Sequence, residues 1–301
     1  MNKIETINRL KKEKDAVILA HYYVPQEIQE VADYIGDSYF LSKIATQVKQ
    51  NTIVFCGVNF MGESAKTLNP HKTVLMPDLA ADCPMAHMAN LDEIKRVKDT
   101  TEDCAVVCYI NSTNEIKALA DVIVTSSNAI KIVKSLNEKN IYFIPDQNLG
   151  KFVASFIPEK NFIYNEGHCP IHNNIQVIDV LDTKLKYPNA LVCAHPECTP
   201  VVLSHADYIG STSGIIEFAQ TSTAQEFIIL TETGILHKLN KACKNKKFYT
   251  ANAYQECKDM KLNTLDKLIT VLENKTSEVK LDESIRLKAL HSLDRMLELA
   301  E

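Results

Sequence analysis

Three cysteines at nearly equal spacing are the residues of this sequence that could carry the most distinctive chemistry. Cys169 lies 86 residues after Cys83, and Cys257 lies 88 residues after Cys169. Each follows a strand-like segment and stands among Asp, Pro, Gly, His or Glu. Cysteine thiolates are the usual ligands of four-iron clusters, which have four corners. Three cysteines would leave one iron open to bind a substrate and polarise its oxygen as a Lewis acid.

Two other interpretations of these three cysteines stay open on spacing alone. The thiolates could hold a zinc ion with an open fourth position, or they could be unrelated buried thiols. Other cysteines have a simpler interpretation. Cys56, Cys108 and Cys193 lie in strand-like runs and are expected to be small buried residues, whereas Cys243 lies in the segment KACKNKK and is expected at the surface.

Polar residues near strand ends could supply acid–base chemistry around such a centre. His21 and His195 titrate near neutral pH and can donate to an oxyanion or carry protons. Glu197, in the segment HPEC, is a candidate general base, especially if burial raises its pKa. The segment GSTSG at 210–214 opens a helix and would suit an anion, or its hydroxyls could simply cap that helix. The candidate hydroxyl donors to phosphate or carboxylate are Ser38, Ser126, Ser211 and Thr212.

These residues recur at equivalent positions of three sequence repeats. Strand-like runs at 16–23, 104–111 and 190–197 align position by position. The residues at two of the aligned positions are His21, Tyr109 and His195, and then Tyr23, Asn111 and Glu197. The register continues through a short strand, a strand that leads to a glycine and a helix, and a last strand followed by one of the three cysteines. The cysteines are therefore equivalent members of a triplicated unit.

Alternation of Val-, Ile- and Phe-rich runs with helical periodicity predicts an α/β protein. We expect three similar α/β/α domains, each with a mostly parallel four-stranded sheet, arranged with pseudo-threefold symmetry around a central active site. The reason is that parallel sheets place ligand sites at the carboxyl ends of their strands. The expected domains, each with one cysteine ligand, are 1–86, 87–172 and 173–262, followed by C-terminal helices at 263–301 that pack on the body.

Composition and charge exclude several classes of function. A net charge of -5 gives no basic footprint for nucleic acid or for an anionic membrane. No run reaches the roughly 18 apolar residues that a membrane helix needs, and no secretory signal is recognisable. We therefore expect a cytoplasmic protein, in which nine cysteines would not form a disulfide framework. The sequence contains neither GxGxxG nor GxxxxGK[ST], which disfavours dinucleotide and nucleoside triphosphate sites.

Taken together, the motifs resemble one family in particular, quinolinate synthase, the A protein of NAD biosynthesis. The resemblance extends over roughly residues 15 to 265, and the motifs follow the family's order. They are AHYY (20–23), GDS (36–38), DCPM (82–85), YIN (109–111), TSSNA (125–129), GHCPIH (167–172), HPEC (195–198), GSTSG (210–214) and ECKDMK (256–261).

The resemblance implies a fold, a cofactor and a reaction. It implies three α/β domains around a pseudo-threefold axis and a [4Fe–4S] cluster on Cys83, Cys169 and Cys257, with one open iron acting as a Lewis acid. The implied enzyme is a synthase with dehydratase chemistry that condenses iminoaspartate with dihydroxyacetone phosphate. Its products would be quinolinate, phosphate and two waters. An L-aspartate-oxidising or dehydrogenating enzyme would be a functional partner.

The resemblance also implies roles for the site residues. The family's acid–base residues correspond to Glu197 and Tyr23, and Met260 follows the third ligand as it does in the family. The implied catalytic residues are Glu197, Tyr23, His21, Tyr109 and His195. The implied substrate-binding residues are His21, Ser38, Tyr109, Asn111, Ser126, His172, His195, Glu197, Ser211 and Thr212. Many members carry a tryptophan shortly before the second cysteine; this chain has none, so the packing under that loop is expected to differ.

Two functions of other classes remain as alternatives. An iron–sulfur redox sensor or electron carrier would have no need of the convergent Ser, His and Tyr residues. A zinc-dependent lyase or aldolase would give a colourless, zinc-loaded protein rather than a brown one.

Overall fold

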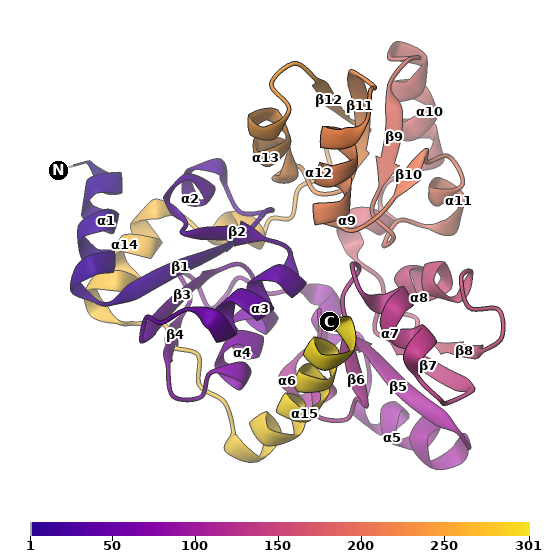
Figure 1. Cartoon of the computed structure of the whole chain (residues 1–301), viewed down its shortest axis with the longest axis horizontal. Coiled ribbons are helices and arrows are strands. Elements are labelled where there is room, and N and C mark those ends of the chain that lie inside the picture. Colours follow the sequence, from indigo (N-terminus) through magenta and orange to yellow (C-terminus); the bar gives the residue numbers. More distant parts are fainter. Residues whose placement is uncertain (1) are drawn as a thin grey trace.

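Three four-stranded sheets, each composed only of parallel strands, form the framework of the protein. A computed structural model describes residues 2–301. Helices flank each sheet, and Figure 1 shows the three sheets arranged around the middle of the molecule. The expected α/β class with threefold repetition is therefore confirmed.

The first sheet contains β1 (Ala16–His21), β2 (Tyr34–Gly36), β3 (Thr52–Cys56) and β4 (Thr73–Leu75). Its strand order is β2-β1-β3-β4. The helices of this part of the chain are α1 (Lys3–Glu13), α2 (Gln26–Val31), α3 (Ser38–Gln47) and α4 (Asn59–Leu68). All six residues of β1 are buried, as expected for a central strand that helices cover on both faces.

The second sheet repeats this arrangement with β5 (Cys104–Tyr109), β6 (Val122–Val124), β7 (Asn140–Ile144) and β8 (Asn161–Tyr164). Its strand order, β6-β5-β7-β8, is that of the first sheet. A 3₁₀ helix, η1 (Pro84–His87), leads into it. Its α-helices are α5 (Leu91–Thr100), α6 (Asn114–Lys117), α7 (Ala129–Ser135) and α8 (Gln147–Ala154).

The third sheet has the same order, β10-β9-β11-β12. Its strands are β9 (Leu191–Ala194), β10 (Tyr208–Ile209), β11 (Glu226–Leu230) and β12 (Lys247–Thr250). The surrounding helices are α9 (Pro170–Asn173), α10 (Val177–Lys186), α11 (Pro200–Leu203), α12 (Thr212–Thr221), α13 (Ile235–Ala242) and the 3₁₀ helix η2 (Met260–Leu262).

Two further helices complete the chain. The helix α14 (Leu265–Asn274) packs against α1 beside the first sheet. The helix α15 (Glu283–Ala300) packs against α4, α6, β6 and α7, so it spans elements of the first two sheets (Figure 1). Between these helices, Glu278 forms an antiparallel bridge with Leu75 of β4.

Short polar side chains fix where several helices begin. The Asp37 side chain accepts the backbone N–H of Phe40 at the start of α3, and that of Asp146 accepts the N–H of Leu149 at the start of α8. Such N-caps satisfy amide groups that have no partner inside the helix. Both helices therefore start directly after their strands, β2 and β7.

Glycine allows two helices to approach their sheets closely. Sequence patterns suggested that Gly62 and Gly150 open helices, but they lie inside α4 and α8. A Cβ atom on Gly62 would come within 2.4 Å of the Met76 sulfur. On Gly150 it would come within 3.0 Å of the Phe143 and Tyr164 rings. In the first two units the glycine thus preserves a close contact rather than a helix start, whereas Gly234 of the third unit does begin its helix, as the N-cap residue before Ile235.

One cysteine lies elsewhere than the sequence suggested. Cys243 is only 7% exposed, because it ends α13 with its side chain in the core of the third sheet. Cys56, Cys108 and Cys193 are fully buried strand residues, as expected. Across residues 2–301, the structure contains no helix with the length and apolar content to cross a membrane.

Candidate active site

The three equally spaced cysteines face one cavity between the three sheets. Cys83 lies in the loop after β4, Cys169 in the loop after β8 and Cys257 in the loop after β12, and all three line this cavity. The cavity offers about 70 Å³ to the centres of water-sized molecules, which is room for several waters. One thiol from each repeat is thus brought to a shared space.

Most residues singled out from the sequence line the same cavity. They are His21, Tyr23, Ser38, Cys83, Tyr109, Asn111, Ser126, Cys169, His172, His195, Glu197, Thr212 and Cys257, with Met260 beside them. Ser211 does not line it. Its hydroxyl instead accepts the backbone N–H of Gly214 at 3.2 Å and caps α12.

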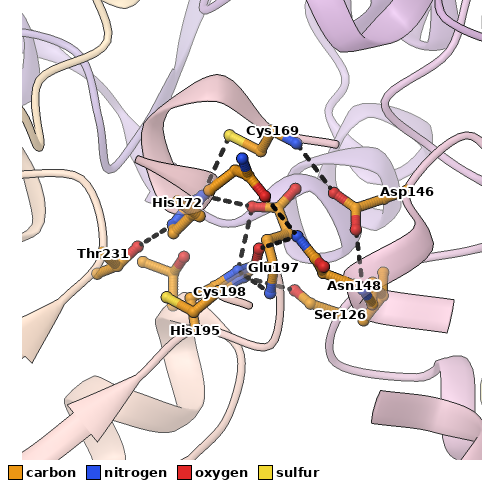
Figure 2. A network of polar contacts seen from close by, with 12 residues as sticks. Ser126, Asp146, Asn148, Cys169, His172, His195, Glu197, Cys198 and Thr231 are labelled. Carbon is orange, nitrogen blue, oxygen red and sulfur yellow. Dashed lines mark hydrogen bonds and ion pairs between the residues drawn. The ribbon is translucent and has the colours of Figure 1, made fainter. Parts of the chain in front are cut away.

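The Glu197 carboxylate is the centre of a buried polar network (Figure 2). Its Oε2 atom lies 2.8 Å from Nδ1 of His172 and 3.1 Å from Nδ1 of His195. The two imidazoles stack with centroids 4.7 Å apart. Their outer nitrogens contact hydroxyls, Nε2 of His172 on Thr231 at 2.8 Å and Nε2 of His195 on Ser126 at 3.2 Å.

These neighbours determine the protonation of Glu197. Burial raises the pKa of the carboxyl, but the two adjacent imidazoles outweigh burial and hold its pKa well below the usual value. Burial lowers the pKa of His195 and lowers that of His21 to about 3. Glu197 is therefore an ionised carboxylate held between two imidazole rings.

Tyr23 connects the first sheet with the third. Its hydroxyl lies 2.9 Å from Oγ1 of Thr212 and 2.7 Å from Oγ1 of Thr231. Its backbone N–H donates to Nδ1 of His21 at 3.2 Å. Burial and the nearby Glu197 charge raise the Tyr23 pKa well above its ordinary value. The phenol is therefore protonated at neutral pH and can act as a donor.

Two buried oxygens in the cavity wall lack a hydrogen-bond partner within residues 2–301. They are Oε1 of Glu197 and Oδ1 of Asn111. An unpaired buried polar atom costs free energy, typically about 1–3 kcal/mol. A polar molecule in the cavity, water or substrate, would relieve this cost, so both oxygens are candidate positions for binding one.

A second set of metal-ligating atoms adjoins the cysteines. Cys169 Sγ, a His172 ring nitrogen and a Glu197 carboxylate oxygen lie within 4.8 Å of one another. Cys169 Sγ itself is 3.1 Å from Nδ1 of His172. The candidate metal-ligating groups of this cavity are therefore the three cysteine thiols and this mixed set.

Several cavity residues and contacts were not anticipated from the sequence, among them three with polar side chains. Thr231 joins Tyr23 to His172, and Glu232 and Asp37 also line the cavity. Thr231 and Glu232 follow β11 directly, in the segment LTETG, where only the glycine stood out. Their position just after the third strand of the repeat, at the carboxyl end of a parallel strand, could have identified them as cavity residues.

Comparison with family models gives one match that covers nearly the whole chain. Residues 5–298 match the model described as Quinolinate synthetase A protein. The chain belongs to this family. Its membership agrees with the resemblance drawn from the sequence motifs.

Individual relatives in the quinolinate synthetase A family are similar over their full length. A protein of Fusobacterium nucleatum named quinolinate synthase is 52% identical over 296 residues, covering 98% of this chain and 99% of the relative. One from Clostridioides difficile is 51% identical, covering 98% and 97%. One from a Sulfurihydrogenibium species is 49% identical, covering 99% and 98%. The two latter relatives carry the same name.

Proposed function

We propose that this chain is a quinolinate synthase of NAD biosynthesis. The reaction joins iminoaspartate to dihydroxyacetone phosphate and releases quinolinate, phosphate and two waters. The observation that supports it most is that Cys83, Cys169 and Cys257, one after each sheet, share a cavity with Glu197 and Tyr23. Family membership and the names of the relatives support the same activity.

The three thiols fit a [4Fe–4S] cluster in their donor type and surroundings. Thiolates are the usual protein ligands of such clusters. Burial raises the pKa of all three thiols, that of Cys257 to about 11, so a bound cation is needed to keep them as thiolates. Charge on Cys257 further raises the pKa of Cys83, as expected for thiols that share one centre. Cys83, Cys169 and Cys257 would hold the cluster, which when bound would supply Lewis-acid chemistry to substrate oxygens.

Glu197 is the proton acceptor in this proposal. Its Oε2 is held by His172 and His195, whereas its Oε1 has no partner within residues 2–301. The free oxygen can take a proton from substrate while the other stays fixed. Positioning by two imidazoles restricts the carboxylate to one orientation, which favours proton transfer at a defined atom.

Tyr23 is the complementary proton donor. Its buried phenol is neutral and lies against Thr212 and Thr231, which orient the hydroxyl. Tyr109, the second cavity tyrosine, is only 5% exposed and is likewise protonated, since burial raises its pKa well above the ordinary value. Asn111 contributes an unpaired amide oxygen to the same wall.

Two helix starts suit the phosphate and carboxylate groups of the substrates. Ser38 is the first residue of α3, and Thr212 is the first residue of α12; both side chains line the cavity. The N-terminus of a helix presents backbone N–H groups and a favourable dipole to anions. Ser126 and His195 add donors from the second and third sheets.

A mononuclear metal lyase is the second candidate. The close approach of Cys169, His172 and Glu197 favours it, since mixed Cys, His and carboxylate sets suit zinc. That function would use only one of the three equally placed cysteines. It would leave the convergence of Cys83 and Cys257 on the same cavity unexplained.

Product formation tests the proposed function. Chemically generated iminoaspartate and dihydroxyacetone phosphate are supplied anaerobically to the wild-type chain and to Cys169→Ala and Cys104→Ala variants. Cys104 begins β5 and does not line the cavity, so it is the matched control. Quinolinate from wild type and Cys104→Ala, but not from Cys169→Ala, is expected. No quinolinate from a wild-type protein with intact metal would reject the proposal.

The same proposal has consequences for the setting of the reaction. An L-aspartate-oxidising or dehydrogenating enzyme would supply iminoaspartate, which hydrolyses in water. A reducing compartment such as the cytoplasm would keep the nine cysteines free of disulfides.

A further inference from the structure

A buried carboxylate beside the third sheet holds the loop of the third cysteine. Glu232 lies two residues beyond the end of β11 and is 1% exposed. Its Oε1 accepts the backbone N–H of Cys257 at 3.0 Å, and its Oε2 accepts the N–H of Gly234 at 2.6 Å. Both oxygens are occupied, so Glu232 lines the cavity without offering a free atom to a substrate.

A lysine connects this carboxylate to the first sheet. Lys261 lies four residues after Cys257, and its Nζ is 2.7 Å from Oε1 of Glu232. The same Nζ donates to the backbone carbonyl of Tyr23 at 2.6 Å. A continuous set of contacts therefore runs from the Cys257 loop through Glu232 and Lys261 to the backbone of the proposed proton donor.

The second sheet has the carboxylate but not the lysine. Asp146 also lies two residues beyond its strand, β7, and is fully buried. Its Oδ2 accepts the backbone N–H of Cys169 at 3.1 Å (Figure 2). Within residues 2–301 no lysine or arginine pairs with Asp146. In both units a buried carboxylate therefore accepts the backbone N–H of the cysteine. Only the third unit adds a lysine to this carboxylate.

The first sheet lacks both features. Val58 occupies the position two residues beyond β3. The backbone N–H of Cys83 donates instead to Oδ1 of Asp82, at 2.8 Å. Asp82 is only half-buried and pairs with His87 at 2.7 Å. The ion pair in the third unit is therefore not a requirement of the repeat.

The boundary between the first and third sheets gives a reason for the additional lysine contact in the third unit. Tyr23 comes from the first sheet, but its hydroxyl contacts Thr212 and Thr231 of the third. A shift between the two sheets would separate the phenol from these hydroxyls. Lys261 opposes such a shift, because it fixes the Tyr23 carbonyl to the same loop that carries Cys257.

We propose that Glu232 and Lys261 are positioning residues that tie the third metal ligand to the proton donor. Glu232 holds the Cys257 loop, and Lys261 fixes the Tyr23 backbone relative to that loop by contacting both Glu232 and the Tyr23 carbonyl. The inference rests on the proposed function for the roles of Cys257 and Tyr23. Partners around metal ligands commonly change metal affinity or activity by about 10-fold to 100-fold when they are mutated.

Two pairs of variants separate the two roles. Glu232→Ala removes the acceptors of the Cys257 loop, whereas Glu232→Gln keeps one carbonyl oxygen for the Cys257 N–H. Lys261→Met removes the link to Tyr23, whereas Lys261→Arg keeps a cation. Lys267→Met is the matched control, because Lys267 forms a similar lysine–carboxylate pair, at 2.6 Å to Asp78, away from the cavity.

Three measurements give the expected pattern. Glu232→Ala should lose iron to a chelator about 10-fold or more faster than wild type, with Glu232→Gln between the two. Lys261→Met should keep its iron and sulfide but lose about 10-fold in kcat at little change in KM, and Lys261→Arg should recover most of this loss. Hydrogen exchange in the metal-free chain should show faster amide exchange over residues 254–260 in Glu232→Ala only.

The exchange measurement keeps this inference separate from the proposed function. If wild type binds no cluster and makes no quinolinate, the proposed function fails, while amide exchange still reports whether Glu232 holds the Cys257 loop. Unchanged exchange and iron loss in Glu232→Ala would overturn the role of Glu232. An effect of Lys261→Met no larger than that of Lys267→Met would overturn the role of Lys261.

Discussion

Glu197 and His172 form a contact that leaves one half of the carboxylate free. Oε2 of Glu197 lies 2.8 Å from Nδ1 of His172, and Oε1 has no partner within residues 2–301. Because both residues are almost fully buried, the free oxygen can be satisfied only by something that enters the cavity. In the proposed function, this free oxygen is the atom that accepts a proton.

Replacement of Glu197 by Gln tests that assignment. The amide has the same shape but cannot accept a proton, so kcat for quinolinate should fall by about 10²–10⁴. Iron and sulfide content should match wild type, since Glu197 is not a proposed cluster ligand. Glu226→Gln is the control, because Glu226 pairs with Lys247 outside the cavity. Near-wild-type turnover of Glu197→Gln would remove Glu197 from the chemistry.

Tyr23→Phe tests the proton donor. The change removes the hydroxyl that contacts Thr212 and Thr231, so kcat should fall by about 100-fold. The free energy of unfolding should fall by only about 1 kcal/mol, the usual net value of such hydrogen bonds. Tyr254→Phe provides the comparison, because Tyr254 is 77% exposed. A loss of kcat that merely follows a loss of folded protein would contradict a role in proton transfer.

The buried Lys117 predicts a pH dependence of stability that is independent of the metal. Its Nζ donates to Oγ of Ser64 and to the carbonyl of Phe60, and burial lowers its pKa from 10.5 to about 8. The unfolded chain therefore binds more protons than the folded chain between pH 8 and 10.5. The contribution of Lys117 to the free energy of unfolding should rise with pH in this window, by roughly 3 kcal/mol at most.

Chemical denaturation of wild type and Lys117→Met at several pH values checks this expectation. The free energy of unfolding of wild type minus that of Lys117→Met should increase from pH 8 toward 10. The same difference for a Lys280→Met control, at an exposed position, should stay constant. A difference that stays flat for Lys117→Met would mean that the buried amine keeps its ordinary pKa.

The sequence predicted the framework well because the fold repeats three times. Strand-like runs in equivalent register mark the central strands of the sheets, and the carboxyl ends of parallel strands must share one edge. This reasoning predicts from the sequence alone that His21, Tyr109 and Cys169 lie near a common site. The cavity lined by residues from all three sheets agrees with that expectation.

Contacts between units could not be predicted in the same way. Whether Lys261 reaches Glu232 or the Tyr23 carbonyl depends on how the first and third sheets pack, and sequence spacing carries no information about it. A local hydrogen bond also changed the expected role of one side chain. The Ser211 hydroxyl caps its own helix instead of facing the cavity, because a helix start offers an unpaired N–H at short range.

The account depends most on a shared iron–sulfur centre bound by Cys83, Cys169 and Cys257. Anaerobic iron, sulfide and zinc analysis of the purified chain, together with the three single Cys→Ala variants and Cys104→Ala, tests this directly. About four iron and four sulfide per chain are expected for wild type and Cys104→Ala, with strong loss in each of the other three variants. A colourless protein that binds about one zinc per chain, or a cluster that survives any of the three substitutions, would contradict the account.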